Sequence, residues 1–336
     1  MESKNVTMKD IAKYTGVSTA TVSRVLNDNY PVNIETKKKV LNAIEELNYE
    51  PNLVAKSLRS NKSNLVAIIV ADIKNSYYVS IAKEIDNHLF KEGYSLITCS
   101  TDESVEKEEE IIRLLLSQQI DAIAISPSDS EKTNLNELIE KNVPIVLVDR
   151  KVSNVPISYV GTNNFKEAYN LTEYLIKKGH RNIGIITGKL NTSTGKERLE
   201  GFKRAMNDHG ITTEKKWILN GDFEEKQAYE IFTHFLENNN ELPTALFSCN
   251  NLMTKGAMFA FKEHSIKIPE DISLVSFGEM ENHEFFDTQI TCIEQDTSYI
   301  GEKVAEILLS QLINKQESKN VIVDSILIEG NSVREI

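Results

Sequence analysis

Residues 7–26 read TMKDIAKYTGVSTATVSRVL, and this stretch decides how the first part of the chain folds. Thr7 and Asp10 have the spacing of a helix-capping pair. Gly16 is expected to end this first short helix, because glycine adopts positive φ at little cost. Ser18 is then a natural N-cap for a second helix. Two short helices joined by a glycine-containing turn are typical of a helix-turn-helix, whose second helix lies in the major groove of DNA.

Apolar side chains recur at helical spacing in this stretch, so each helix has an inner and an outer face. The inner faces are expected to hold Ile11, Ala12 and Tyr14 in the first helix and Val22, Val25 and Leu26 in the second. The second helix is left with an outer face of small side chains and one arginine, which is the face expected to meet DNA. That face comprises Thr19, Ala20, Ser23 and Arg24.

Arg24 is the one long cationic side chain on this outer face. Its forked guanidinium suits the two acceptors of a guanine edge, and Thr19 and Ala20 can contact thymine methyl groups. The side chains expected to bind phosphates are Thr21, Ser23 and Asn27. The candidate DNA contacts also include Thr7, Ser18 and Asn52. A small helical hairpin with a solvated arginine is the alternative interpretation.

A third helix is expected after Asn33, its N-cap, and Pro51 ends this region. Its inner stripe is predicted to consist of Val40, Leu41, Ile44 and Leu47. The lysines at 37–39 are expected at its outer end. A run of charge on a helix is usually a solvated face, so these lysines are not candidate DNA contacts.

The run DIAKYTGVSTATVSRVLN at 10–27, followed by YEPNLVAKSLRS at 49–60, resembles the lac repressor and galactose repressor family of bacterial transcription regulators. The resemblance implies a hinge helix within 51–63 that pairs with its copy from a second subunit in the minor groove of DNA. Leu58 would wedge into the central base step and kink the duplex, with Val54 packed against its symmetry mate. Without the resemblance, Leu58 is an ordinary interdomain packing residue.

Such pairing predicts that the chain binds a double-stranded, pseudopalindromic operator as a homodimer or as a tetramer of paired dimers. Residues 1–62 carry 10 Lys and Arg against 7 Asp and Glu, whereas the 336-residue chain has a net charge of −12. DNA contact is therefore expected from the N-terminal part. The chain has neither a run of roughly 18 apolar residues nor the apolar core of a secretion signal, so a cytoplasmic protein without a membrane partner is expected.

From Leu65 onward, apolar strand-like runs alternate with amphipathic helices, and the alternation restarts after Asn163. This pattern predicts an α/β fold with two lobes of doubly wound parallel sheet after the helix-turn-helix. The expected division is a DNA-binding domain at 1–50, a hinge at 51–63 and a core at 64–336. The resemblance implies a periplasmic-binding-protein-like core with crossovers near Thr162, Cys292 and Asn320. The lobes would then comprise about 64–162 with 293–320, and about 163–292 with 321–336.

Ligands of open α/β sheets bind beyond the carboxyl ends of the strands, which predicts a site in the cleft between the lobes. Strand ends supply the candidates Ser76, Tyr77, Tyr78, Asp149, Arg150 and Phe223. Aromatic rings together with charged hydrogen-bonding groups suit a sugar-like ligand. The resemblance adds Arg198 and Asn250 to this effector pocket. Taken singly, Asp149 and Arg150 could form a simple ion pair, and the tyrosines could pack between the lobes.

The resemblance also leaves the chemistry of the effector open. Gly278 stands where many relatives carry a sugar-binding aspartate, and Glu279 is expected to substitute for it. The two arginines favour an anionic sugar derivative, such as a sugar acid or a sugar phosphate, because they form forked, charge-assisted bonds with anions. A neutral sugar, with Glu279 as the replacement acceptor, is the alternative.

The sequence predicts no enzyme, no metal site and no cofactor. The six histidines, including His180, His209, His264 and His283, lack metal-ligand spacing and are expected in surface or loop positions. The expected reduced core thiols are Cys99, Cys249 and Cys292. Two alternatives to an effector-controlled repressor are a soluble sugar-binding protein and a regulator controlled by a phosphorylated protein partner.

Overall fold

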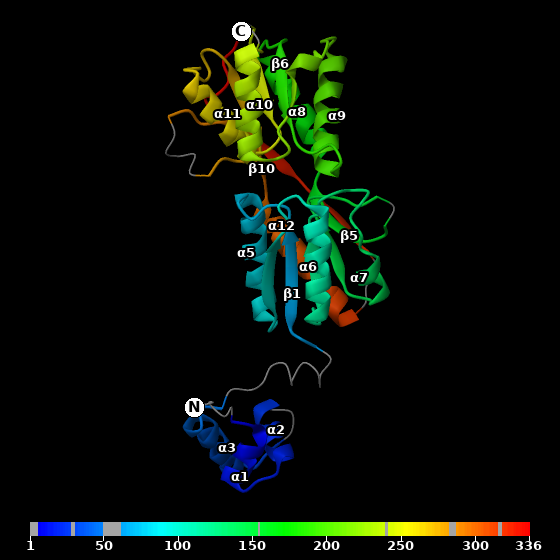
Figure 1. The fold of residues 1–336 in the computed structure, drawn as a ribbon, viewed down its shortest axis with the longest axis vertical. Helices are drawn as coiled ribbons and strands as arrows, with labels where there is room; N and C mark the ends of the chain where they lie inside the picture. The colour runs from blue at the N-terminus through cyan, green and yellow to red at the C-terminus, as the bar shows by residue number, and fades with distance from the viewer. Residues whose placement is uncertain are drawn as a thin grey trace. The chain divides into compact units, whose positions relative to one another are not determined.

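The computed structural model describes residues 6–27, 31–49, 62–153, 155–238, 241–281, 287–314 and 318–336. The chain forms two units, Met1–Ser63 and Asn64–Ile336 (Figure 1). The predicted hinge contacts Asn52, Val54 and Leu58 lie outside the described residues. Among the residues that are described, no helix is both long enough and apolar enough to cross a membrane.

The N-terminal unit contains the predicted helices as α1 (Met8–Thr15), α2 (Thr19–Asn27) and α3 (Ile34–Glu46). The Asp10 carboxylate accepts hydrogen bonds from the backbone N–H and the hydroxyl of Thr7. Gly16 ends α1 with a φ of 67°, and the Ser18 hydroxyl accepts from the N–H of Thr21 at 3.1 Å. These caps fix both ends of the turn between α1 and α2.

Three side chains of this unit lie on other faces than expected. Tyr14 is 59% exposed, and its hydroxyl donates to Glu46. Thr15 takes the inner position instead, because it lies one turn after Ile11 and its hydroxyl donates to the carbonyl of Ile11 at 2.7 Å. Leu41 is also exposed, at the edge of the inner stripe of α3. Ser23 is only 9% exposed, so it faces inward and does not belong to the outer face of α2.

The core unit contains two lobes, each built on a six-stranded sheet. The first lobe, here the N-lobe, has the strand order β11-β5-β4-β3-β1-β2, with all pairs parallel. Apolar clusters lie on both faces of this sheet, as expected for parallel strands. Its strands are β1 (Leu65–Val70), β2 (Ser95–Ser100), β3 (Ala122–Ile125), β4 (Ile145–Val148), β5 (Ser158–Thr162) and β11 (Asn320–Val323). Its helices are α5 (Ser76–Lys91), α6 (Val105–Ser117), α7 (Asn136–Glu140) and α12 (Thr297–Asn314).

The second lobe, here the C-lobe, has the order β12-β10-β9-β8-β6-β7, in which only the pair β10 and β12 is antiparallel. Its strands are β6 (Ile183–Thr187), β7 (Ile218–Asn220), β8 (Ala245–Ser248), β9 (Ser273–Phe277), β10 (Thr291–Gln295) and β12 (Ser325–Ile328). Its helices are α8 (Asn164–Lys177), α9 (Ser193–Asp208), the 3-10 turn η1 (Lys215–Trp217), α10 (Glu225–Asn238) and α11 (Asn251–Glu263).

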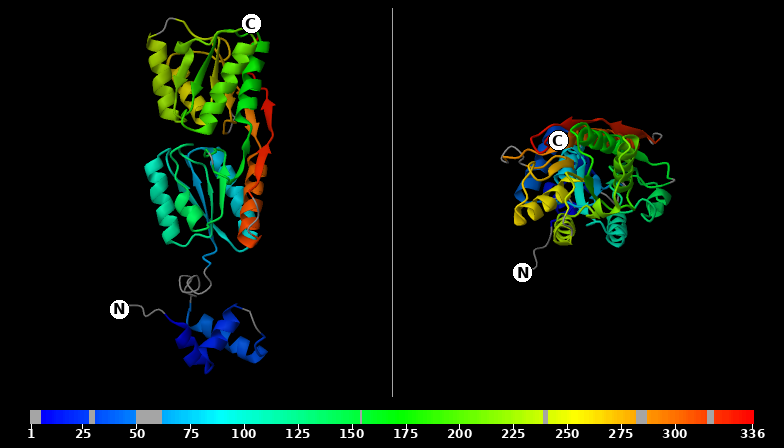
Figure 2. Two further views of the ribbon diagram at one scale, coloured as in Figure 1. Left: turned by 90° about the vertical axis from the view of Figure 1, so that its right-hand side faces the viewer. Right: turned by 90° about the horizontal axis from the view of Figure 1, so that it is seen from above.

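The chain crosses between the lobes three times, and the three crossings lie on one side of the core unit (Figure 2). The first follows Thr162, as expected. The second lies between Gln295 and Thr297, and the third at Asp324, so the expected crossovers near Cys292 and Asn320 are about three or four residues early. Extended strand leads into each of these crossings, so no turn signal in the sequence marks them.

Cys249 and Cys292 are buried free thiols, and burial raises the pKa of each to about 12. Cys99 is half-buried and also free. The expectation that the histidines lie in surface or loop positions is wrong for His180. Its buried ring lies 2.9 Å from the Thr244 hydroxyl and 3.1 Å from the carbonyl of Arg334. No group of His, Cys, Asp or Glu within the described ranges could hold a metal ion.

Candidate functional site

The outer face of α2 presents most of the side chains predicted to meet DNA. Ser18, Thr19, Ala20 and Arg24 are exposed, and Thr21 is half-buried. Thr7 is exposed at the start of α1, where its hydroxyl already donates to Asp10. Asn27 is the last residue of α2. Small side chains surround one arginine on this face, so a duplex could approach the helix closely.

A second candidate site is the cleft between the lobes, where the carboxyl ends of the two parallel sheets face each other. A cavity of about 30 Å³ lies there. The predicted residues that line it are Tyr77, Tyr78, Asp149, Arg150, Arg198, Phe223 and Asn250. Two predicted residues do not line it. Ser76 bonds across the cleft to Asn251 at 3.3 Å, and Glu279 is exposed and does not line the cavity beside Gly278.

Asp149 lines this cavity and contacts several of its other lining residues. Its carboxylate accepts from the hydroxyl of Tyr77 at 3.3 Å and from that of Tyr78 at 3.0 Å. Burial raises the pKa of both tyrosines, and the Asp149 carboxylate raises it further, so both hydroxyls keep their protons and donate. Asp149 itself has a φ of 64°, a conformation that is uncommon outside glycine and often occurs at functional sites.

Arg150 forms its close ion pair with Glu103, not with the adjacent Asp149. The two guanidinium ends donate to the two Glu103 oxygens at 2.7 and 2.6 Å, whereas Asp149 lies 4.0 Å from Nε. Asp149 and Arg150 thus form a longer contact as well, so the alternative of a simple pair between them holds only in part. Glu103 was not among the predicted residues. It follows the end of β2, so the same strand-end rule that selected Asp149 would have found it.

Arg198 projects from α9 and is held mainly by its own lobe. Its Nε donates to Asn164 at 2.8 Å, and one guanidinium end donates to the carbonyl of Cys249. The guanidinium lies 3.6 Å from the centre of the Phe277 ring. Its other end lies 4.0 Å from the Asp149 carboxylate of the N-lobe. Arg198 and Asp149 thus face each other across the cleft.

Phe223 places its ring between the charged groups of both lobes. Its ring centre is 5.0 Å from the Arg150 guanidinium and 5.9 Å from that of Arg198. A Cβ on Gly188 would lie 2.0 Å from this ring, so only glycine leaves room for it there. Asn250 has a structural role: its Oδ1 caps α11 at the N–H of Met253, and its Nδ2 donates to the carbonyl of Phe223.

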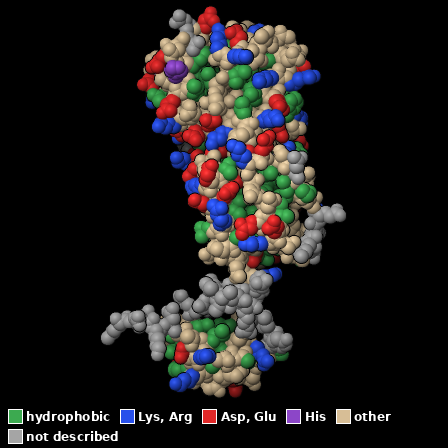
Figure 3. Space-filling model, turned by 45° about the vertical axis from the view of Figure 1, so that its right-hand side comes forward, with side chains coloured by type: hydrophobic (Ala, Val, Ile, Leu, Met, Phe, Trp, Pro, Cys, Tyr) green, Lys and Arg blue, Asp and Glu red, His purple; other side chains and the backbone are tan. Residues whose placement is uncertain are grey.

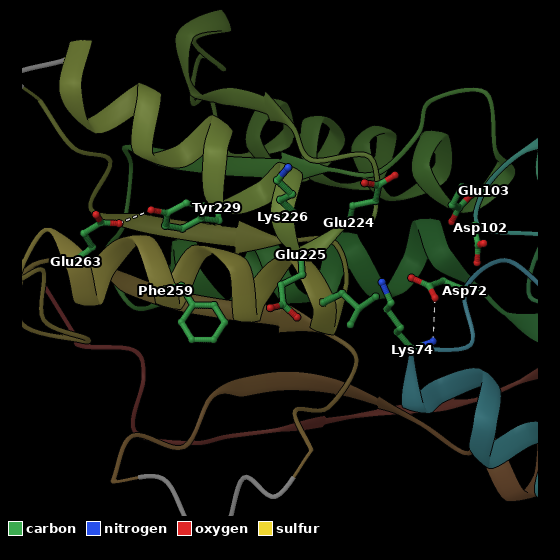
Figure 4. A pocket seen from close by; sticks show the side chains of 11 residues that line it. Asp72, Lys74, Asp102, Glu103, Glu224, Glu225, Lys226, Tyr229, Phe259 and Glu263 are labelled. Carbon is green, nitrogen blue, oxygen red and sulfur yellow. Dashed lines mark hydrogen bonds between the residues drawn. The ribbon is translucent and has the colours of Figure 1, made fainter. Parts of the chain in front are cut away.

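A larger hollow of about 800 Å³ adjoins the cavity (Figure 4). Asp72, Glu103 and Leu252 line both spaces. Acidic side chains outnumber basic ones in the hollow, which is also lined by Lys74, Asp102, Glu224, Glu225, Lys226, Tyr229, Phe259 and Glu263. Charged side chains of both signs intermingle on one face of the core unit (Figure 3).

Comparison with known proteins assigns both units. Residues 7–52 match the family model of bacterial regulatory proteins, lacI family, and residues 63–329 match that of periplasmic binding proteins and the sugar binding domain of the LacI family. The chain is 36% identical over 317 residues to the HTH-type transcriptional repressor PurR of Pasteurella multocida (strain Pm70), covering 94% of this chain and 95% of that protein. It is 34% identical to PurR of Proteus mirabilis (strain HI4320) over 331 residues, covering 97% and 96%.

The crystal structure of the lac repressor dimer bound to operator and the anti-inducer ONPF superposes with a TM-score of 0.86 at 26% identity, covering 98% of this chain and 100% of that one. These similarities extend over both units, and the relatives are repressors, not enzymes. The chain therefore belongs to the lacI family of bacterial regulatory proteins and is a DNA-binding transcriptional repressor with a periplasmic-binding-protein-like core.

Proposed function

We propose that a small sugar or sugar derivative, bound between the lobes at Asp149 and Arg198, controls the operator binding of this repressor and hence genes of carbohydrate use. The observation that carries the proposal is the 4.0 Å approach of these two charges from opposite lobes. A ligand that bonds to both groups contacts both lobes. Its affinity then depends on how the lobes are arranged, which is the requirement for allosteric control.

The chemistry of the cleft supports a polyhydroxylated ligand. The Asp149 carboxylate accepts from hydroxyl groups and the Arg198 guanidinium donates to them, so neighbouring hydroxyls of one sugar can use both. The Phe223 ring offers an apolar surface for the C–H groups of a sugar. Among structures of similar fold, the transcriptional regulator CelR was solved as a cellobiose complex, at 25% identity and a TM-score of 0.73.

A cavity of 30 Å³ is far smaller than a typical ligand pocket of about 300 to 1,000 Å³. A sugar therefore binds only if side chains or lobes move from the arrangement described here. The ligand can shift operator binding only by the difference between its affinities for the two arrangements. This makes the cleft a sensor as well as a binding site.

The experiment is a thermal-shift screen of pentoses, hexoses, disaccharides, sugar acids and sugar phosphates, followed by operator gel shifts with each compound that stabilises the protein. We expect at least one compound both to raise the unfolding midpoint and to change operator affinity. If no small molecule does so, and a phosphorylated protein partner changes operator affinity instead, the proposal is wrong.

We also propose that α2 reads the operator and that two copies of the chain bind a pseudopalindrome with their hinges in the minor groove. Leu58→Ala is expected to lower operator affinity and reduce the DNA bend, because an inserted leucine unstacks the central step. Circular-permutation gels measure the bend, and Leu53→Ala in the same segment is the control. An unchanged bend in Leu58→Ala would exclude the wedge.

A further inference from the structure

The Glu103 carboxylate forms a two-bond ion pair with the Arg150 guanidinium, in the geometry that the carboxylate of a ligand would use. Two parallel bonds of 2.7 and 2.6 Å join the two groups, whose side chains are only 5% and 3% exposed. Forked bonds of this kind are the strong form of arginine recognition. Glu103 follows Asp102 in a turn where both residues have positive φ, 60° and 50°.

Opening of the cleft would not separate this pair, because Glu103 and Arg150 both belong to the N-lobe. Arg150 also donates to the carbonyl of Pro127 at 3.2 Å. Its buried Nε has no hydrogen-bond partner among the described residues and lies 4.0 Å from Asp149. A ligand that enters the open cleft thus meets an arginine whose two guanidinium ends Glu103 already holds.

Glu103 has space into which it can move. It lines both the 30 Å³ cavity and the 800 Å³ hollow, so the hollow offers open space beside its side chain. Figure 4 shows Glu103 beside Asp102 in the lining of that hollow. Lys74 lines that hollow, and it is close enough to Asp102 to help lower the pKa of that carboxyl. Solvent in this larger space weakens the repulsion between a carboxylate and the acidic groups around it, and Lys74 offsets part of their charge.

Charge decides which ligand can displace Glu103. The buried charged groups of the cavity are Arg150 and Arg198 against Asp149 and Glu103, so they balance. A neutral ligand that displaced Glu103 would leave Arg150 without its close partner, and an uncompensated buried charge is strongly destabilising. A ligand carboxylate restores both the charge and the two-oxygen geometry.

We propose that Glu103 is a tethered competitor of the effector, and that the effector carries a carboxylate, as sugar acids do, which replaces Glu103 on Arg150. This inference rests on the proposed function, which makes the ligand of the cleft the effector that controls operator binding. It also explains how the cavity gains room, since removal of the Glu103 side chain vacates the space that the ligand carboxylate needs.

The test is chemical rescue of Glu103→Ala in the full-length protein. Sodium acetate, compared with sodium chloride at equal ionic strength, is expected to raise the unfolding midpoint of this variant by about 2 to 4 °C at ten times its Kd. The wild type, whose Arg150 is occupied, is expected to show no acetate effect. Asp102→Ala removes the neighbouring carboxylate, which bonds to Lys107 and Ser100 and is 63% exposed, and should also show none.

Rescue must disappear in the double variant Glu103→Ala/Arg150→Ala. Absence of rescue in Glu103→Ala, or equal rescue in Asp102→Ala, overturns the inference. If Glu103→Ala does not fold, Glu103→Gln keeps the side-chain volume and is expected to bind acetate more tightly than the wild type does. If a neutral sugar alone releases the wild-type protein from its operator, the carboxylate inference fails while the proposed function stands. Stabilisation of Glu103→Ala by inorganic phosphate but not by acetate also overturns the carboxylate inference.

Discussion

Arg198→Ala is expected to abolish the response of operator binding to the effector while leaving operator binding itself intact. Arg198 is the C-lobe donor that faces Asp149 across the cleft. Hydrogen bonds to a charged group contribute about 1.5 to 3 kcal/mol, so loss of this donor should lower the affinity for the effector by about 10- to 150-fold. At an effector concentration that just saturates the wild type, the variant then stays largely unbound. Gel shifts with the compound found in the thermal-shift screen measure the response.

Arg204→Ala is the matched control. Arg204 lies on the same helix, α9, but is 61% exposed and bonds to Asp208 one turn later. Its removal should change neither effector affinity nor operator binding. Arg198 also bonds to Asn164 and to the carbonyl of Cys249, so unfolding of each variant must be followed in parallel. A stable Arg198→Ala protein that still responds normally would reduce Arg198 to a packing residue.

Single residues predicted the helix-turn-helix because each of them meets a requirement of the backbone at a helix end. Gly16 takes the positive φ at the end of α1, and Ser18 accepts from the first turn of α2. The predicted face is wrong where two neighbours compete for one inner position, as Tyr14 and Thr15 do. Tyr14 is larger and more apolar than Thr15, but the Thr15 hydroxyl is satisfied inside its own helix and fits the close approach of the helices.

The cleft was predicted only in part, because strand ends show which residues converge but not how they pair. Asp149, Arg150 and Phe223 line the cavity, as their positions after strands indicated. The Glu103 partner of Arg150 depends on side-chain directions that no spacing in the sequence encodes. Glu279 follows strand β9 closely and yet is exposed, since the chain turns away after Gly278, whose φ is 95°.

Arg24→Ala is expected to reduce the preference for the operator over scrambled DNA by about 5- to 150-fold, because a forked contact from arginine to guanine contributes about 1 to 3 kcal/mol of discrimination. Arg24 is exposed on α2 beside Thr19 and Ala20, whose small side chains allow the helix to enter the groove. Competition footprinting of operator against scrambled DNA gives the ratio directly.

Two further variants separate base reading from simple charge. Arg24→Lys keeps the positive charge but loses the fork, so its nonspecific affinity should stay close to that of the wild type while the preference falls. Lys13→Ala removes one exposed charge from α1 and should weaken all DNA alike, leaving the ratio unchanged. If Arg24→Lys retains the full preference, charge alone suffices at this position, and the guanine contact must be assigned to another side chain of α2.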